Sequence, residues 1–467
     1  RPWKIHKFGG SSLASADCFK RVAKILLDYD DSRIGVVVSA MGGMTDALIN
    51  LTIQAEQSDD SFVKALNAIG KRYSETASSL LESNALSPIL NAWSSDAKDI
   101  IDLLNSISLV KSAPQRSRDV VAGYGEIWSA RLLSAFLAQE SPTRGGTWVD
   151  ARNVIVVRDN ELGPAVLWSE SQRKFDCELN DKFSGIAVIT GFIAADEDGL
   201  QTTLGRNGSD HSASIFAALS KASLLTIWTD VDGVMSADPR LVPEAQVIDR
   251  LTYNEAMELA YFGAKVIHPQ TLGPAVENKI PVVIRNSFNS KHPGSRIEQE
   301  SVPSGKIKGI TAIGDMALIN LEGSGMIGVP GTADRLFTSL KDAGVSVTLI
   351  SQASSEHSIC IAVPEGVSTK ARNVIINAFS DELKSGQIHS VDITSGQSIV
   401  AVVGDGMAGS PGLAAKFFGT LARAGVNINA IAQGSSERNI SVVIDSSDAT
   451  KALRSSHSGF YLSAKTI

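Results

Sequence analysis

The last third of the chain contains the same segment twice, and this repeat limits the folds open to it. Residues 323–363 read GSGMIGVPGTADRLFTSLKDAGVSVTLISQASSEHSICIAV, and residues 404–444 read GDGMAGSPGLAAKFFGTLARAGVNINAIAQGSSERNISVVI. The copies agree in a glycine–proline loop and in a polar stretch that contains Gln352 or Gln433. Two copies are too few for a solenoid. We therefore interpret the repeat as a pair of small binding modules, preceded by a part of the chain that carries out chemistry.

Each copy predicts the same short fold. A strand at Ala317–Leu321 or Ile399–Val403 precedes the glycine–proline loop, and a helix at Thr332–Ala343 or Leu413–Ala424 follows it. Two further strands complete each copy. The order strand, loop, helix, strand, strand is typical of a small α+β sandwich.

Composition excludes several classes of protein. At roughly 150 residues per domain, 467 residues predict about three domains. The 43% apolar and 20% charged residues are typical of globular chains, and a net charge of −7 argues against nucleic acid and anionic membranes as partners. No apolar run reaches about 18 residues, so we expect no membrane-spanning helix. The cysteines fit no metal-site spacing and are expected to be reduced: Cys18, Cys177 and Cys360.

Short apolar runs recur through the first 290 residues and predict strands. The runs are continuous rather than alternating, which indicates strands buried on both faces, as in parallel sheets. Helical patterns at Asp17–Leu27 and Ser209–Leu219 lie between them. This alternation predicts an α/β sandwich around a largely parallel sheet. The predicted strands are Trp3–Phe8, Ile34–Val38, Val154–Val157, Ile186–Ile189, Leu224–Trp228 and Ile280–Ile284.

Two changes in composition mark boundaries. Residues 54–109 are polar and biased toward helix, which predicts a helical insertion. Residues 291–308 are rich in Pro, Gly, Ser and Lys, which predicts a linker. We therefore predict a catalytic domain at 1–290, a first module at 309–390 and a second module with the C-terminal segment at 391–467.

A glycine-rich loop follows the first predicted strand. It reads Lys7-Phe8-Gly9-Gly10-Ser11-Ser12 and precedes a helix. Adjacent glycines permit positive φ and close approach of the backbone, so amides there can hold an anion beside a helix N-terminus, and Lys7 adds a positive charge. An ordinary strand–turn–helix with an exposed lysine would leave the same residues. The pattern is not a G-x-x-x-x-G-K-[ST] loop.

Further polar loops follow later strands. Residues 203–210 read TLGRNGSD and open a helix, where Arg206 offers a donor fork suited to a carboxylate or phosphate. Residues 228–234 read WTDVDGV, and residues 238–240 read DPR. Helix caps and turns explain such residues singly. Because ligands bind at the carboxyl ends of strands in open α/β sheets, the loops together predict a site.

Three single residues join these loops as candidates. Glu126 begins a helix after a glycine-rich turn, and Ser39 and Thr45 flank Gly42-Gly43 after the second predicted strand. A favourable charge near a helix N-terminus would explain Glu126 without any ligand. Loop hydroxyls such as Ser39 are also common for local reasons.

In combination and in order, the motifs resemble those of the aspartate kinases of the amino acid kinase family. The matching stretches are KFGGSS, SAM-x-x-x-T, GE, GRNGSD, WTDVDGV, DPR, YFGAKVIHP and two ACT-type repeats. The resemblance implies the amino acid kinase fold, a mostly parallel sheet sandwiched by helices, followed by two α+β ACT-type (ferredoxin-like) regulatory domains. It implies transfer of the γ-phosphoryl group of ATP to the β-carboxylate of L-aspartate. Mg²⁺ would arrive with ATP, without a dedicated protein metal site.

The resemblance also assigns roles at the reacting groups. Lys7 would stabilise charge on the transferred phosphoryl group, and Asp210 would orient the transfer site. Arg206 would bind the α-carboxylate of aspartate, and Glu126 its ammonium group. The nucleophilic carboxylate is ionised at neutral pH, so no strong general base is needed. Further contacts to aspartate would come from Ser39, Thr45 and Ser209.

The nucleotide would be held by a larger set of residues, and two positions depart from the commonest family pattern. Asn207 stands where many members have glycine, and Met235 where many have tyrosine, which puts an aromatic contact to the nucleotide in doubt. Neither change removes a charge that the reaction needs. The expected nucleotide contacts are Lys7, Gly9, Gly10, Ser11, Thr229, Asp230, Met235, Asp238, Arg240 and Lys265.

The repeat carries a closer resemblance. MIGVPGTA, ISQASSEHS, IAQGSSE and HSGFYLSAKTI are most similar to the kinase half of bifunctional aspartokinase–homoserine dehydrogenases. Those enzymes are threonine-inhibited, which implies Gln352 and Gln433 as effector contacts, with Met326 and Gly331 beside them. A glutamine offers a donor and an acceptor to a small hydroxylated amino acid, although each could instead cap a corner between strand and loop. We expect threonine as the effector, with lysine as the alternative.

Other readings remain open. The chain could be a non-catalytic amino-acid sensor on a kinase scaffold, or a kinase for another acid such as glutamate. We expect no dehydrogenase activity from this chain, a homodimer or homotetramer, and no nucleic acid or membrane partner. The chain begins at Arg1 without Met, so a removed targeting segment would be invisible. A bacterial cytoplasm is the first expectation for its location, and plastid stroma the second.

Overall fold

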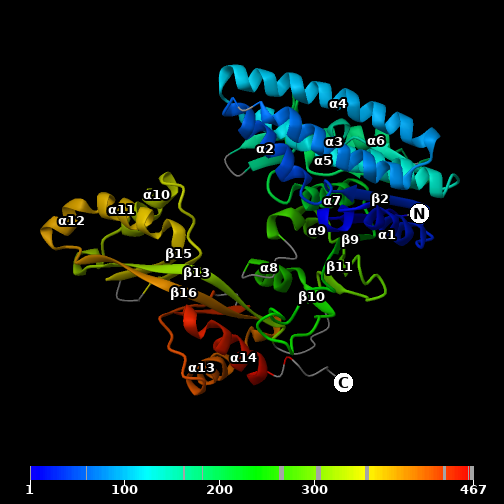
Figure 1. The fold of residues 1–467 in the computed structure, drawn as a ribbon. Helices are drawn as coiled ribbons and strands as arrows, with labels where there is room; N and C mark the ends of the chain where they lie inside the picture. Colours follow the sequence, from blue (N-terminus) through cyan, green and yellow to red (C-terminus); the bar gives the residue numbers. More distant parts are fainter. Residues whose placement is uncertain are drawn as a thin grey trace. The chain divides into compact units, whose positions relative to one another are not determined.

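The structure, a computed structural model, divides into two units of chain (Figure 1). The first unit is Arg1–Val234 with Val266–Ser301, and the second is Met235–Lys265 with Val302–Ile467. The chain therefore leaves the first unit after Val234 and returns to it at Val266. The structure describes residues 2–58, 60–160, 163–180, 182–261, 268–300, 307–352, 357–434, 438–460 and 462.

A largely parallel sheet forms the core of the first unit. Its strands are β1 (Lys4–Phe8), β2 (Arg33–Val38), β3 (Gly146–Val149), β6 (Gly185–Thr190), β9 (Leu224–Thr229), β11 (Val282–Asn286) and β12 (Ser295–Glu298). Their order is β12-β11-β9-β1-β2-β6-β3, and only the pair of β11 and β12 is antiparallel. The apolar runs of β2 and β6 are almost wholly buried. The predicted parallel α/β core is thus confirmed.

Helices pack against this sheet and around its loops. The predicted helices are confirmed as α1 (Ala16–Leu27) and α7 (Gly208–Leu219), and α7 contacts β1, β2 and β9. The longer α5 (Gln115–Glu140) contacts β2, β3 and β6. The remaining small elements of this unit are β4 (Val157–Asn160), β5 (Gly163–Val166), β7 (Ile193–Ala195), β8 (Gln201–Thr203), α6 (Trp168–Glu178) and α9 (Gly273–Glu277).

The predicted insertion at residues 54–109 is helical. It contains the end of α2 (Met44–Glu56), all of α3 (Ser61–Leu80) and most of α4 (Ser83–Val110). These helices pack on one another, and the buried Tyr73 hydroxyl of α3 donates to the carbonyl of Trp128 in α5 at 3.1 Å. The layer of α2 to α5 is visible as the blue-to-cyan helices of Figure 1.

Two segments differ from their sequence-based predictions. The run Val154–Val157 is buried, but it is no strand of the parallel sheet. It follows a short 3-10 turn, and only Val157 enters β4, which pairs with β5 as a hairpin. The segment 291–308, predicted as a linker, contains β12, because Gly294 at φ +81° turns the chain back onto β11.

An antiparallel sheet organises the second unit. Its strands are β13 (Gly309–Glu322), β14 (Leu349–Gln352), β15 (Ser358–Pro364), β16 (Ser390–Val403), β17 (Ala430–Ala432) and β18 (Asn439–Asp445). Their order is β14-β15-β13-β16-β18-β17. The helices are α10 (Thr332–Asp342), α11 (Ser368–Ala378), α12 (Ser380–Ser385), α13 (Leu413–Arg423) and α14 (Ala449–Gly459). The predicted order strand, loop, helix, strand, strand is confirmed in both copies, and each copy also has a second helix after its last strand.

The two modules share their longest strands. Gly309–Ile313 of β13 pairs with Ile399–Val403 of β16, whereas Met316–Glu322 pairs with both β15 and the first half of β16. The register shifts around Asp315, whose φ is +54°. Figure 1 shows α10 and α11 on one side of these strands and α13 and α14 on the other. Each module therefore takes one half of each long strand.

The shared strands connect three apolar clusters. One cluster packs α10 and α11 on residues such as Ile319 and Leu321, and another packs α13 and α14 on Val400 and Val402. The alternate side chains of the same strands, such as Leu318, form a third cluster with the edge strands β14 and β17, which contact each other. Both loops after β13 and β16 read G-x-G-x-x-G, but a dinucleotide-binding loop of that pattern requires a parallel βαβ unit.

The segment from Met235 onward packs on the second module. It contains β10 (Arg250–Thr252) and α8 (Tyr253–Tyr261). The Ser236 hydroxyl and the His457 ring are hydrogen-bonded at 2.9 Å, and the Asp405 N–H donates to the Glu255 carboxylate at 2.9 Å. This part of the chain is thus built into the core of the second unit.

Candidate active site

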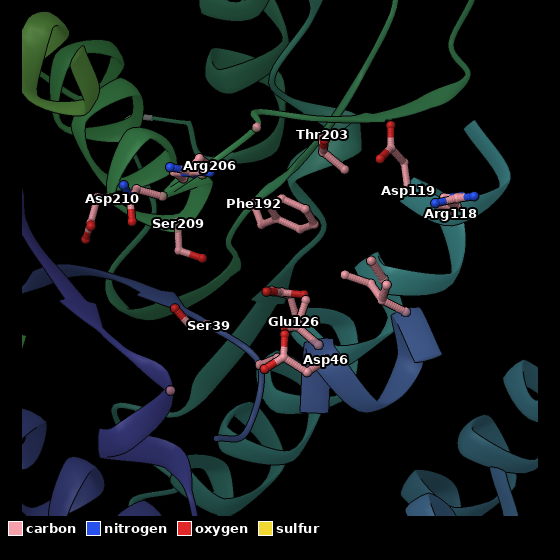
Figure 2. A pocket seen from close by; sticks show the side chains of 18 of the residues that line it. Ser39, Asp46, Arg118, Asp119, Glu126, Phe192, Thr203, Arg206, Ser209 and Asp210 are labelled. Atoms are coloured by element: carbon pink, nitrogen blue, oxygen red, sulfur yellow. The ribbon is translucent and has the colours of Figure 1, made fainter. Parts of the chain in front are cut away.

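A cavity of about 990 Å³ opens in the first unit beside the ends of its central strands (Figure 2). β1 ends at Phe8 and β2 at Val38, which are paired in register, and the Ser39 N–H donates to the Phe8 carbonyl at 3.1 Å. The loops that follow the two strands therefore start side by side. Many of the residues predicted from the sequence line this cavity: Lys7, Gly10, Ser39, Thr45, Glu126, Arg206, Ser209 and Asp210.

Lys7 and Asp210 form an ion pair at the cavity wall. Their charged atoms lie 2.7 Å apart, and the side chains are 12% and 16% exposed. Lys7 stands on β1, and Asp210 lies in the first turn of α7. The pair holds an ammonium group next to the amide-rich start of a helix, which is a favourable place for an anion.

Glu126 is the most deeply buried ionisable group of the cavity, and it lies in the interior of α5 rather than at the start of a helix as predicted. The residue is 4% exposed, and burial raises the pKa of its carboxyl group to about 8. Hydrogen bonds from the backbone N–H groups of Glu126 and Ala40 lower this pKa, but burial has the larger effect. Figure 2 shows Glu126 among the residues that line the cavity. Its Oε2 is buried without a hydrogen-bond partner among the described residues. A ligand cation would supply that partner and would favour the ionised carboxylate.

Arg206 lies in an exposed turn just before α7. Gly205 and Asn207 on either side have φ of +74° and +56°. Asparagine tolerates this left-handed region better than most residues, which explains how Asn207 can replace the more common glycine. The next residue must be glycine, because a Cβ at Gly208 would lie 2.7 Å from the Phe192 ring. The turn thus presents the Arg206 fork at the N-terminus of α7.

The cavity also contains residues that the sequence reasoning missed. Asp46 lies in the first turn of α2, and Phe192 follows β6 with φ of +70°. The Arg118 guanidinium donates to both carboxylate oxygens of Glu56, at 2.8 and 2.9 Å. No local motif marks these positions. The packing of α5 brings Arg118 to the site, whereas Asp46 and Phe192 are placed by α2 and by the turn after β6. The other missed lining residues are Ile49, Gln115, Asp119 and Ala122.

The predicted nucleotide contacts are not all brought together. In the first unit, Gly9 and Ser11 belong to the turn after β1, Thr229 ends β9 and Asp230 follows it; none of these four lines the cavity. In the second unit, the exposed Arg240 pairs with Asp238 at 2.7 Å. Met235 also belongs to the second unit, and Lys265 lies outside the described residues.

The predicted regulatory residues line two cavities in the second unit. Met326, Gly331 and Gln352 surround a cavity of about 270 Å³ together with Gly328, Val329, Pro330, Thr332, Ala333 and Ile359. Gln433 lines a different cavity, of about 430 Å³, between the edge strands β14 and β17. Gln352 lines both cavities, so the two glutamines meet at the second one.

Some features of other protein classes are not found in the described part of the chain. It contains no group of three or more His, Cys, Asp or Glu side chains arranged to hold a metal ion. None of its helices is long and apolar enough to cross a membrane. The three cysteines are free, as predicted from their spacing.

The chain matches known families over most of its length. The amino acid kinase family matches residues 2–286, and the ACT domain matches residues 319–379 and 400–460. Bifunctional aspartokinase/homoserine dehydrogenase 1, chloroplastic, of Arabidopsis thaliana is 42% identical over all of this chain and 52% of its own length. Aspartokinase 2, chloroplastic, of the same plant is 30% identical over 98% of this chain and 84% of its own. The chain spans about half the length of the bifunctional relatives.

Solved structures agree with these relatives. Aspartokinase III of E. coli, in complex with aspartate and ADP, superposes with a TM-score of 0.80 at 26% identity, over 98% of this chain and 99% of that chain. Aspartate kinase of Clostridium acetobutylicum does so with a TM-score of 0.81 at 28% identity, over 98% and 100%. Family, fold and the order of the parts agree, so the chain belongs to the amino acid kinase family, among the aspartokinases with ACT domains.

Proposed function

We propose that this chain transfers the γ-phosphoryl group of ATP to the β-carboxylate of L-aspartate, giving β-aspartyl phosphate and ADP. A bond forms between a carboxylate oxygen and the γ-phosphorus, and the bond from that phosphorus to the bridging oxygen of ADP breaks. The observation that carries the proposal is the single cavity that contains the Lys7–Asp210 ion pair, the buried Glu126 and the Arg206 fork. The E. coli structure with aspartate and ADP supports it by analogy.

In this proposal the ionisable side chains of the cavity select an amino acid. Glu126 binds the ammonium group, because a buried carboxyl group without a partner gains most from a cation. Arg206 binds the α-carboxylate with its donor fork. Ser39, Thr45 and Ser209 add hydroxyl contacts from the loop after β2, from α2 and from α7. The β-carboxylate is thereby left facing Lys7.

Phosphoryl transfer itself needs alignment and neutralised charge more than covalent help. Lys7 supplies the positive charge, Asp210 fixes its position at 2.7 Å, and the amides near Gly9, Gly10 and Ser11 receive phosphoryl oxygens. The aspartate carboxylate is already ionised, so the reaction requires no general base. ATP enters as its Mg²⁺ complex. We retain Thr229, Asp230, Met235, Asp238, Arg240 and Lys265 as proposed nucleotide contacts.

The second unit is proposed to bind an inhibitory amino acid. The cavity of Met326, Gly331 and Gln352 is of a size suited to a small amino acid, and threonine is the proposed effector. Lysine is the alternative, since a solved E. coli aspartokinase III contains lysine. Titration of the kinase with threonine, lysine and S-adenosylmethionine separates the two. Inhibition by lysine but not by threonine contradicts the threonine assignment.

Several broader statements are also proposals. We propose a catalytic domain at 1–290 with its helical insertion at 54–109, and regulatory modules at 309–390 and 391–467. We propose a homodimer or homotetramer. For the location, the chloroplastic plant relatives favour plastid stroma over the bacterial cytoplasm expected from the sequence.

The activity is tested by trapping the acyl phosphate. Hydroxylamine converts β-aspartyl phosphate into a hydroxamate, whose complex with ferric iron is coloured, so the chain is incubated with ATP, Mg²⁺, hydroxylamine and either aspartate or glutamate. We expect hydroxamate with aspartate only. No hydroxamate with either acid would favour a non-catalytic sensor, and hydroxamate with glutamate would change the substrate.

A further inference from the structure

Two glycine loops meet at the floor of the active site. We name residues 9–14, after β1, the first glycine loop, and residues 39–43, after β2, the second glycine loop. A Cβ atom on Gly10 would lie 3.2 Å from the Ala40 carbonyl oxygen, and one on Gly42 would lie 3.2 Å from the Gly10 carbonyl oxygen. The backbones of the two loops therefore lie against each other at Gly10 and Gly42.

Each loop serves a different partner in the proposed reaction. Gly9 of the first loop lies beside Lys7, since a Cβ there would be 3.5 Å from the Lys7 Nζ. The second loop contains Ser39, and its Ala40 N–H donates to the Glu126 carboxylate. The first loop thus belongs to the phosphoryl side of the site and the second to the amino-acid side. The distance between the loops sets the distance between the two reactants.

One side chain outside the cavity connects the two loops. The Nη2 atom of Arg72 donates to the Ala14 carbonyl at 3.1 Å and to the Gly42 carbonyl at 2.8 Å. Arg72 stands on α3, which is held by its buried residues Phe62, Leu66 and Tyr73, so the Arg72 Cα is fixed by packing. The Ala14 carbonyl follows a 3-10 turn, and a cation suits the carbonyl end of such a turn.

We propose that Arg72 is a positioning residue of the kinase reaction. It holds the two glycine loops at one separation and so keeps Lys7 in line with the bound aspartate, without touching either substrate. Misplacing reactants by about 1 Å can cost on the order of 100-fold in rate, even when the change lies outside the reacting groups. The inference rests on the proposed function and adds a residue to it.

The role predicts a specific kinetic pattern. Each substrate still meets its own loop when Arg72 is lost, so binding survives while alignment does not. Arg72→Ala should lower kcat by about 10- to 100-fold and change KM for aspartate and for ATP by less than about threefold. Arg72→Lys should recover part of the loss, because an ammonium group still donates to carbonyl oxygens but lacks the planar fork. Hydroxamate formation measures all three quantities.

The matched control is Lys71→Ala, one residue earlier on the same helix. Lys71 is 77% exposed and pairs with Glu75 within α3, so its loss removes a positive charge without touching either loop. Its kcat should equal that of the wild type. A similar loss of kcat in Lys71→Ala would overturn the proposal, as would an Arg72→Ala variant with wild-type kcat or with only a raised KM.

A second measurement does not depend on activity. Hydrogen–deuterium exchange, read by mass spectrometry in the full chain, should be faster in Arg72→Ala at residues 9–14 and 39–43, with Lys71→Ala unchanged. Unchanged exchange in both loops would overturn the role of Arg72 even if the wild type proved inactive. Absence of hydroxamate from the wild type, by contrast, would overturn the proposed function alone.

Discussion

The Nζ atom of Lys7 and a carboxylate oxygen of Asp210 lie 2.7 Å apart, one on a strand of the sheet and the other on the helix that covers it. We predict that Lys7→Ala lowers kcat by at least about 100-fold, since one charge that stabilises a transition state is commonly worth that much. Asp210→Asn should lower kcat as well, because Lys7 loses its fixed position. Hydroxamate formation measures both variants.

The same variants test the separation of catalysis from regulation. Threonine binding to Lys7→Ala, followed by calorimetry, should equal that of the wild type, because the proposed effector residues belong to the second unit. Equal loss of turnover and threonine binding would instead indicate a misfolded variant. Circular dichroism and a thermal melt identify that case.

The raised pKa of Glu126 predicts a pH-dependent affinity for aspartate. With a pKa of about 8, the free enzyme holds Glu126 mostly protonated at pH 7, whereas binding of an ammonium group requires the carboxylate. Binding therefore releases a proton. KM for aspartate should fall about tenfold per pH unit between roughly pH 6 and 8 and level off above pH 8. Initial rates at saturating ATP across this range measure the slope.

Glu126→Gln is the control for that slope. The amide cannot ionise, so KM for aspartate should rise and its dependence on pH in this range should disappear. A variant that keeps the wild-type slope would show that a different group titrates.

The cavities of the second unit predict an asymmetry between the two repeated glutamines. Gln352 lines both cavities, whereas Gln433 lines only the one between β14 and β17. Gln352→Ala should therefore raise the threonine concentration for half-inhibition of the kinase by about tenfold or more, the equivalent of one or two lost hydrogen bonds. Gln433→Ala should have the smaller effect. Inhibition curves at fixed substrate concentrations give the threonine concentration for half-inhibition of each variant. A larger increase in Gln433→Ala than in Gln352→Ala would contradict the prediction.

The hydrogen bonds of Glu255 are expected to stabilise the packing of the segment after Met235 on the second module. The carboxylate is 2% exposed and accepts from the N–H groups of Asp405 at 2.9 Å and Thr252 at 3.0 Å. Glu255→Ala leaves both donors unsatisfied, which should destabilise the second unit by about 2–4 kcal/mol. Urea unfolding measures the loss. Asp381→Ala, at a side chain 91% exposed, should change stability by less than about 0.5 kcal/mol.

Local patterns predicted the central strands and the loops that build the site. The apolar runs of β2 and β6 are continuous because both faces of these strands are covered. Lys7, Arg206 and Asp210 stand in glycine-rich stretches, a pattern typical of loops whose backbone closely approaches a ligand or another loop. Such signals lie within a few residues of the side chain concerned. The central strands and these site residues could therefore be predicted without knowledge of the tertiary packing.

Other residues could not be predicted, because long-range packing places them. Arg118 and Asp119 reach the cavity through the position of α5, and Arg72 reaches the glycine loops through that of α3. Neither helix carries a motif for this. The strand predicted at Val154–Val157 was wrong, because this apolar run is buried by tertiary packing around a short turn and not by pairing in the sheet.

The long strands β13 and β16 mean that the repeat in the sequence is not a repeat of self-sufficient parts. Each strand has 14 residues and gives one half to each module. A cut within β16 would leave both modules with a missing strand and an open sheet edge, so neither copy can be excised, transplanted or lost alone. A ligand that shifts one half of such a strand displaces the other half with it. The duplicated segment is thus one body, in which the two modules and their cavities share the same two strands.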